Sequence, residues 1–583
     1  MKSQRFTKTL SACGAAATVA LGSFAFATPA SAATSAPEGP KNVILLIGDG
    51  MGYNHLDNMN AYENGEVYWQ VDRGGDNKVK PWGGNSTPTE GFQAWDQVSM
   101  ETAWYEQDPY DTQAAWGDFE QVKDNPTDSA AAGTAMATGH KTYNAGIGVD
   151  YNENVVENVS ERAHELGKSA GVVSSVPFSH ATPAAFSSHN TSRNDYEGIA
   201  AEQVNSEYMD VVMGAGHPYY NDDHQPTETG DFSYISEESF EQLRNGESDF
   251  TYIEENADFE ALTTGDTPDQ VFGIPQVGST LQQNRTDDAT LNDVVDLPTM
   301  TEGALNVLDN NDEGFFLMVE GGAIDWTGHA NQTERNIEET IDFSNSIDSV
   351  VNWVEQNSSW DETLVIVTAD HETGYLSGAN YELDADGNQI PVEGSTDYVL
   401  GDWGPMEPTE AGSAPTQDWF SDNHTTMLVP YFVKGAGADT LLGYATGHDL
   451  VRGNYLSNVD MANWLLDDAW VANAAPTDPT TDPEPTADPE PSEPTQTEPT
   501  ETDPAQTEPT QTSDAPTDPT STDSSGDQGK GDAANGNQGS NDADGSLATT
   551  GADMFGPIAI AAGVLLLAGA AILVIRRRQQ HDA

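Results

Sequence analysis

Acidic and imidazole side chains follow three of the most apolar runs in the chain. Asp49 follows "NVILLIG", Glu320 follows "FLMV", and the pair Asp370 and His371 follows "LVIVTA". Short continuous apolar runs are typical of strands that are buried on both faces. A charged group at such a strand end is costly unless it is paired or coordinated. One such acid could cap a helix, but acids at three strand ends favour a metal site.

A second group of candidate ligands lies in "EGGAIDWTGH". Asp325 and His329 are four residues apart, a spacing that places both side chains on one face of a helix. Such a pair alone is more often a surface pair, but this one follows Glu320 closely, and His424 precedes a further apolar run. Mixed histidine and carboxylate sets suit Zn²⁺, whereas oxygen-only sets suit Mg²⁺. This combination of residues therefore predicts that the protein binds metal ions.

Ser129 begins a run of small residues in "TDSAAAGTAMATGH" and directly follows an acid. One interpretation is an ordinary small-residue helix that packs closely on a sheet. The other is a nucleophile presented at a helix N-terminus, where the helix dipole favours negative charge. The run itself leaves both interpretations open.

Apolar runs alternate with helical patterns through the middle of the chain. The runs occupy 42–48, 170–176, 315–322, 364–370 and 427–435. Apolar residues at helical spacing predict helices over 155–166 and 337–354. This alternation predicts an α/β fold: a doubly wound, mostly parallel central sheet with helices on both faces. Ligands of such sheets bind at the carboxyl ends of the strands, where the candidate ligands lie.

Two stretches, 55–120 and 217–300, are rich in Asp, Gly, Asn and aromatic residues and have weak periodicity. We expect both to be surface insertions. Their histidines, which include His55 and His217, are then expected to be solvated.

The two ends of the chain have the composition of targeting and linker segments. Residues 1–32 combine a basic start, an apolar stretch and an A-x-A site, which predicts a secretory signal peptide. The single cysteine, Cys13, lies inside it, so the mature protein has no disulfide. Residues 475–546 are dominated first by Pro, Thr, Asp and Glu and then by Gly, Ser, Asn and Asp, which predicts an extended stalk. The folded domain is therefore expected over 33–474.

The C-terminal segment, 547–583, contains "LATTG", an apolar stretch over 557–575 that predicts a transmembrane helix, and a basic tail. This order resembles a sortase sorting signal of Gram-positive bacteria, with Ala548 in place of the usual proline. The resemblance implies that a sortase cuts between Thr550 and Gly551 and joins the protein to the cell wall. The alternative is a plain membrane anchor. In either case we expect an exported protein at the outer face of the cell.

Acidic residues outnumber basic ones by 96 to 21, which gives the chain a formal net charge of −75. Such a field repels nucleic acids and anionic membranes, so nucleic acid is excluded as a partner. It suits solubility at high ionic strength, where salt screens the self-repulsion.

Six blocks together resemble the alkaline phosphatase family, and they occur in the order typical of that family. The blocks are "NVILLIGDGMG", "PTDSAAAGTAMATGHKTYNAGIGVD", "HATPAAFSSHNTSR", "VEGGAIDWTGH", "VIVTADHETG" and "NHTTMLVP". The resemblance implies extracellular hydrolysis of small phosphate monoesters by domain 33–474, through a phosphoserine at Ser129, with Arg193 gripping the phosphate oxygens. We also expect a homodimer.

The resemblance further implies two zinc ions and one magnesium ion. One Zn²⁺ would be held by Asp325, His329 and His424, and the other by Asp49, Asp370 and His371. Mg²⁺ would be held by Asp49, Thr182 and Glu320. His180 and Trp326 stand beside these ligands at positions that vary in the family, and they bear on the identity of the third ion.

The alternative functions are those of a sulfatase, a phosphodiesterase and a non-catalytic binding protein. A sulfatase of the same superfamily usually has a modified Cys or Ser in a C/S-x-P-x-R setting, whereas alanines follow Ser129. Phosphodiesterases of the superfamily often use Thr as the nucleophile and lack the set Thr182, Glu320 and Arg193. A non-catalytic, wall-anchored binding protein would be expected to have lost some ligands, and here the set is complete.

Overall fold

The structure is a computed structural model that describes residues 39–73, 78–286, 290–378, 381–383, 389–391 and 403–470. The predicted signal peptide, stalk and C-terminal segment lie outside the described residues. Within the described part, no helix is both long and apolar enough to cross a membrane.

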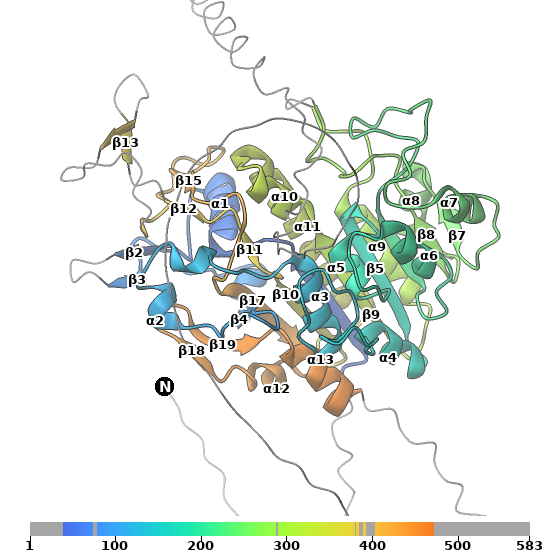
Figure 1. The fold of residues 1–583 in the computed structure, drawn as a ribbon, viewed down its shortest axis with the longest axis horizontal. Helices are drawn as coiled ribbons and strands as arrows, with labels where there is room; N and C mark the ends of the chain where they lie inside the picture. Colours follow the sequence, from blue (N-terminus) through green and yellow to red (C-terminus); the bar gives the residue numbers. More distant parts are fainter. Residues whose placement is uncertain are drawn as a thin grey trace, which may run out of the picture. The chain divides into compact units, whose positions relative to one another are not determined.

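An eleven-stranded sheet forms the centre of the described part (Figure 1). In sheet order its strands are β18 (Gly447–Asp449), β19 (Gly453–Ser457), β4 (Asp96–Glu101), β17 (Val429–Gly435), β10 (Thr363–Thr368), β1 (Asn42–Gly48), β9 (Phe315–Gly321), β5 (Ser169–Pro177), β6 (Val211–Ala215), β8 (Val271–Gly273) and β7 (Thr251–Ile253). Only β18–β19, β4–β17 and β17–β10 are antiparallel; the other neighbouring pairs are parallel. The predicted α/β fold with a mostly parallel sheet is confirmed.

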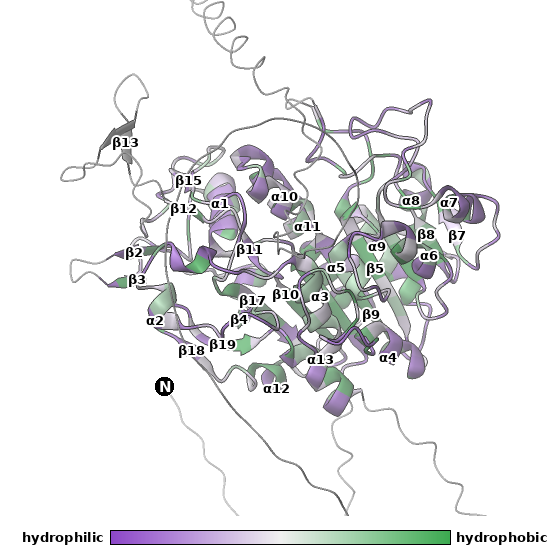
Figure 2. Ribbon diagram, in the orientation of Figure 1, coloured by the Kyte–Doolittle hydropathy of each residue, from purple (hydrophilic) through white to green (hydrophobic). Residues whose placement is uncertain are grey.

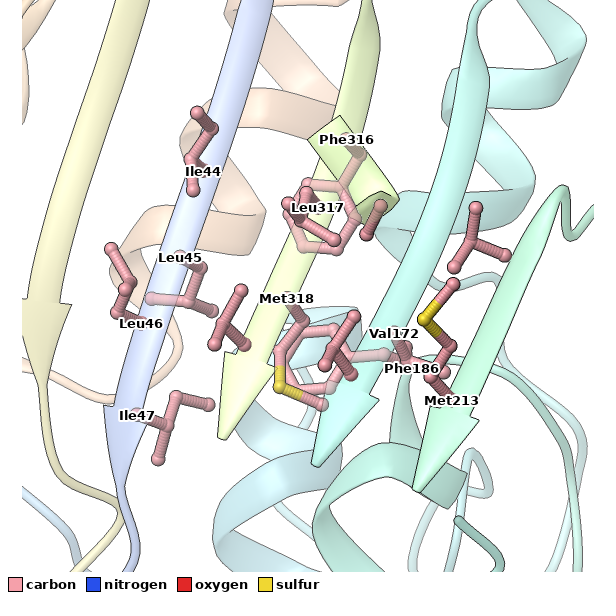
Figure 3. Packing of buried hydrophobic residues seen from close by; sticks show 14 of the residues in the cluster. Ile44, Leu45, Leu46, Ile47, Val172, Phe186, Met213, Phe316, Leu317 and Met318 are labelled. Atoms are coloured by element: carbon pink, nitrogen blue, oxygen red, sulfur yellow. The ribbon is translucent and has the colours of Figure 1, made fainter. Parts of the chain in front are cut away.

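The central strands are buried along almost their whole length, as continuous apolar runs require. Figure 3 shows β1, β9, β5 and β6 side by side, with Ile47, Met318 and Met213 among the side chains that fill the layer. Figure 2 shows hydrophobic residues concentrated in these strands, whereas the outlying helix α7 (Glu237–Arg244) is mostly hydrophilic. Each fully buried aliphatic side chain contributes about 1.5–3 kcal/mol.

Helices pack against both faces of the sheet. A Cβ at Gly171 of β5 would point at Leu308, the last residue of α9 (Leu297–Leu308). The next residue, Val172, faces the opposite side, where Figure 3 places it beside Phe186, which directly follows α5 (Ala181–Ala185). On the first face, α9 packs with α8 (Asn256–Leu262) and α11 (Thr333–Asn357), and α11 packs with α1 (Tyr53–Asn64) and α10 (Ala323–His329). On the second, α5 packs with α3 (Ser129–Thr138), and α3 packs with α4 (Val159–Glu165) and α13 (Asp460–Trp464).

The prediction that 55–120 and 217–300 are surface insertions was wrong in part. The first stretch supplies most of the buried helix α1 and an inner strand, β4, and the second supplies β7 and β8 at one edge of the sheet. His55 and His217 are accordingly buried, not solvated. These strands have three to six residues each, too short or too polar to give a buried-strand pattern.

The predicted helix over 155–166 begins later than expected. Asn158 caps α4 through Ser160 N and Glu161 N, and the Glu161 side chain returns to Asn158 N. This capping box fixes the start of the helix at Val159. The predicted helix over 337–354 is confirmed within α11.

Candidate metal centre and nucleophile

Three neighbouring parallel strands bring the candidate ligands to one edge of the sheet. In the registers of β10, β1 and β9, Ile47 lies opposite both Thr368 and Glu320. Asp49 directly follows β1, Glu320 is the penultimate residue of β9, and Asp370 lies two residues after the end of β10. The candidate ligands of all three strands therefore lie at the carboxyl edge of the sheet.

Asp49, Asp370 and His371 form the first ligand cluster. Their ligand atoms all lie within 4.8 Å of one another, and all three side chains are fully buried. His371 Nε2 is 3.5 Å from Asp49 Oδ1 and 3.2 Å from Asp370 Oδ2. Gly50, in the left-handed region at φ 71°, turns the chain so that its N–H donates to Asp370 Oδ1.

Asp325, His329 and His424 form the second cluster, again within 4.8 Å. The i,i+4 pair lies in α10, and the strand-like segment β16 (His424–Thr425) supplies the third ligand. His329 Nε2 and His424 Nε2 are 3.1 Å apart, and each lies 3.4 Å from Asp325 Oδ1. The two clusters adjoin, because the His371 and His424 rings stack with centroids 3.6 Å apart.

Hydrogen bonds on the far side of each ring orient the histidines as ligands. His329 Nδ1 lies 2.7 Å from Asp422 O, and His424 Nδ1 lies 2.7 Å from Thr127 O. A carbonyl oxygen only accepts, so each Nδ1 carries the hydrogen and each Nε2 presents a lone pair to the cluster. Such partners are typical of metal-ligating histidines.

The donor set fits cations, since buried carboxylate oxygens at this edge lack other partners. Both Asp49 oxygens, Glu320 Oε1 and Asp370 Oδ2 have no hydrogen-bond partner among the described residues. Burial, together with the Asp370 and Asp325 carboxylates, raises the pKa of Asp49 well above its usual value. Burial likewise raises the pKa of Asp370 to about 6. A cation would remove this mutual repulsion.

The oxygen-rich corner around Glu320 matches the predicted third site in part. Burial raises the pKa of Glu320 to about 7, and the hydrogen bond from the Ser174 hydroxyl opposes this rise. Ser174 donates to Glu320 Oε2, which leaves Oε1 for another partner. Thr182 is fully buried in α5. Its Oγ1 has no hydrogen-bond partner among the described residues, and the Glu320 charge acts on Asp49.

Ser129 is the first residue of α3, and its side chain faces the metal ligands. Its Oγ lies 3.2 Å from His371 Nε2, and the residue is 2 % exposed. Asp128 caps the helix, accepting from Ala131 N at 2.9 Å. Both interpretations of the small-residue run are therefore compatible: a closely packed helix that places a serine at the ligand clusters.

The Arg193 side chain contacts Asp128, the residue before Ser129, although the two are 65 residues apart in the chain. Its Nη1 donates to Asp128 Oδ2 at 3.1 Å, and the residue is 5 % exposed. Its Nη2 lies 3.4 Å from His180 Nε2. The half-buried Trp326 ring meets His180 edge-on with centroids 5.6 Å apart, so it forms a wall beside the arginine.

Two residues at the site were missed in the sequence, Asp128 as a partner of Arg193 and Thr373 as a bridge. Thr373 Oγ1 donates to Asp325 Oδ1 at 2.5 Å and lies 3.2 Å from His371 Nδ1, so it links the two clusters. A signal existed for Thr373: it lies two residues after His371, a spacing that puts both side chains on one face of an extended chain. Nothing in the sequence connects Asp128 to Arg193.

The chain is similar in sequence to proteins called alkaline phosphatases. It is 33% identical over 352 residues to alkaline phosphatase 4 of Bacillus subtilis (strain 168), an alignment that covers 59% of this chain and 64% of that protein. It is 34% identical over 355 residues to alkaline phosphatase 3 of the same organism, covering 60% of this chain and 63% of that protein. The chain thus spans less than two thirds of the length of these relatives.

Among solved structures, the alkaline phosphatase of the Antarctic bacterium TAB5 aligns with 74% of this chain and 100% of its own, at 23% identity and a TM-score of 0.49. The family model described as alkaline phosphatase matches residues 93–395, which include Ser129, Arg193, Asp325 and His371 but neither Asp49 nor His424. Because this match covers more than half of the chain, the protein belongs to the alkaline phosphatase family.

Proposed function

We propose that this protein hydrolyses phosphate monoesters through a phosphoserine at Ser129. The observation that carries the proposal is the meeting of a helix-terminal serine, two clusters of metal-ligand side chains and a buried arginine at one sheet edge. Membership of the alkaline phosphatase family supports the same reaction class.

Zn²⁺ would be held by Asp325, His329 and His424 in one cluster and by Asp49, Asp370 and His371 in the other. Mg²⁺ would be held by Asp49, Thr182 and Glu320. When bound, such ions polarise phosphoryl oxygens and favour the deprotonated serine.

Arg193, Ser129 and the N-terminus of α3 have different parts in the proposed reaction. Arg193 binds two phosphate oxygens of the ester with its planar guanidinium fork. Ser129 Oγ attacks phosphorus, the ester P–O bond breaks, and the leaving alcohol takes up a proton. Water then attacks the phosphoserine, releasing inorganic phosphate and restoring the Ser129 hydroxyl. The N-terminus of α3 stabilises the charge that develops beside Ser129.

The test compares the parent with Ser129→Ala on p-nitrophenyl phosphate, its bis-ester and its sulfate. We expect the parent to prefer the monoester and Ser129→Ala to lose roughly a thousandfold or more in kcat while its metal content is unchanged. Ser160→Ala, a buried serine in α4, is the matched control and keeps the parent rate. Full activity in Ser129→Ala would refute the nucleophile, and faster turnover of the bis-ester would favour a phosphodiesterase.

We propose further that the protein is exported and anchored at the outer face of a Gram-positive cell. The supporting features are the signal peptide 1–32, the stalk 475–546 and the segment 547–583 with its "LATTG" motif. Mass spectrometry of protein released from purified cell walls should find a C-terminus at Thr550 joined to wall peptide. Detection of peptides from the basic tail in the membrane fraction alone would instead support the plain membrane anchor.

A further inference from the structure

His189 lies outside both ligand clusters, on the chain segment that leads to Arg193. Its side chain is 10 % exposed and touches two acidic side chains. The mechanism proposed above gives it no role. This half-buried, doubly paired imidazole lies four residues before Arg193.

Every acceptor around the His189 ring is an oxygen. Nδ1 lies 2.9 Å from Glu202 Oε1, and Nε2 lies 3.4 Å from Glu161 Oε2 and 3.2 Å from Val156 O. A neutral imidazole has one N–H, so one ring nitrogen would turn a lone pair toward oxygen. Only the imidazolium donates in both directions, and the geometry therefore fits the charged ring.

The two glutamates belong to helices on either side of the arginine segment. Glu161 completes the capping box of α4, and Glu202 lies in α6 (Tyr196–Val204), whose helix begins just after Arg193. Glu202 also accepts from His189 N at 3.1 Å, so two hydrogen bonds close a loop over 189–202. Arg193 lies inside this closed loop.

Hydrogen bonds also join the Arg193 segment to the loop 145–148, which in turn contacts Asp128. Asn190 pairs with Ile147 through two backbone hydrogen bonds of 2.9 Å, and Arg193 N donates to Ala145 O at 2.8 Å. Ala145 N in turn donates to Asp128 Oδ2, the oxygen that also binds Arg193. At Gly148, φ is 58° and a Cβ would come within 2.6 Å of His189 Cδ2, so the ring packs directly on this loop.

We propose that His189, as an imidazolium bridging Glu161 and Glu202, is a positioning residue that holds the Arg193 segment in its phosphate-binding geometry. The inference rests on the proposed function and assigns a part in it to a residue that touches neither substrate nor metal. When His189 loses its proton, the neutral ring can donate a hydrogen bond to only one of the two glutamates. Substrate binding then weakens at high pH, while the chemical step at Ser129 is affected less.

The titratable groups that face His189 determine the pH at which the ring loses its proton. Burial opposes the charge, but Glu161 and Glu202 outweigh it and raise the pKa of His189 to about 9. Tyr208, which lies near both glutamates, has its own pKa raised by burial and by their charges, so it stays neutral. Because the folded pKa exceeds the ordinary value of about 6.5, the stabilisation is complete below about pH 6.5 and is lost as pH rises through about 9.

The first test measures KM and kcat for p-nitrophenyl phosphate between pH 7 and 10.5, with the affinity for inorganic phosphate measured by calorimetry on the metal-loaded protein. We expect the parent to bind phosphate more weakly above about pH 9. Glu202→Gln, which removes one carboxylate, should move this weakening down by about one pH unit or more. His189→Gln should bind phosphate about tenfold more weakly at pH 7.5 and lose the pH dependence, with kcat changed less than about threefold.

His164→Gln is the matched control, since His164 is an exposed histidine on α4, and it should reproduce the parent profile. A second readout is the histidine ring signal in an NMR pH titration, identified by its absence in His189→Gln. A midpoint near that of free histidine, or a phosphate-affinity profile unchanged in Glu202→Gln, would overturn the proposal. A parent that binds phosphate but hydrolyses no monoester would count against the proposed function alone, because binding and titration are read without turnover.

Discussion

Thr373 allows a test of whether metal binding depends on the contact between the two ligand clusters, because its hydroxyl touches both. Its hydroxyl is fully buried in β11 (Glu372–Thr373), donates to Asp325 Oδ1 of one cluster and lies 3.2 Å from His371 Nδ1 of the other. Because the hydroxyl hydrogen goes to Asp325, its oxygen is left to accept from His371 Nδ1. His371 Nδ1 then carries the ring hydrogen, and the lone pair of Nε2 points toward Asp49 and Asp370. Thr373→Val keeps the branched shape and removes both interactions.

The expected magnitude follows from the charged partner. A hydrogen bond to a charged group is worth about 1.5–3 kcal/mol net, and each 1.4 kcal/mol is about a factor of ten in affinity. Thr373→Val should therefore weaken metal binding by about tenfold to a hundredfold, the usual range for such supporting partners. The fold should survive, since a valine fits the same extended backbone.

The assay is competition with a metal-binding dye, together with the rate at which chelator inactivates the protein. Thr368→Val is the matched control: Thr368 is equally buried at the end of β10, but its hydroxyl donates to Pro430 O, away from the clusters. The control should lose about 1 kcal/mol of folding stability and retain the parent's metal affinity. Equal metal affinity in Thr373→Val and the parent would refute the bridge.

Three further predictions concern the site and its supports. Gly50→Ala should abolish metal binding, measured as metal content after dialysis, because a Cβ at φ 71° would come within 2.7 Å of Thr373 Oγ1 and 2.9 Å of Asp325 Cα. Asn158→Ala should lower the free energy of unfolding by about 0.5–2 kcal/mol in urea titrations, because the capping box of α4 is lost. Removal of metal by chelator should lower Tm, and re-addition of zinc should restore it, because buried Asp49 and Asp370 then repel each other.

The long apolar runs predicted the centre of the fold well, since burial on both faces leaves a signal in every residue of a strand. The run at 42–48 coincides with β1, and each of the other four runs overlaps most or all of one sheet strand. β4 has no such signal because only two of its six residues are buried, and its place between β17 and β19 depends on pairing across the chain.

His55 illustrates why burial of polar residues was hard to predict. It is buried because Gly52 N donates to its Nδ1 and the Trp419 ring lies 5.7 Å away. The first partner is local, but the second comes from the far end of the domain. The start of α4, in contrast, was wrongly placed at 155 although a signal for it was present, because Asn158 followed three residues later by Glu161 is a capping-box signature.

Asp128 shows how one side chain couples residues that the sequence presents separately. One oxygen caps α3 through Ala131 N, and the other accepts from Arg193 Nη1 and Ala145 N. An N-cap alone could be Ser, Thr or Asn at little cost, but only a carboxylate can also neutralise a buried guanidinium. The same acid therefore fixes the helix that carries Ser129 and the arginine that faces it. Asp128 therefore holds the proposed nucleophile and the proposed phosphate-binding arginine in fixed relative positions before any phosphate ester binds.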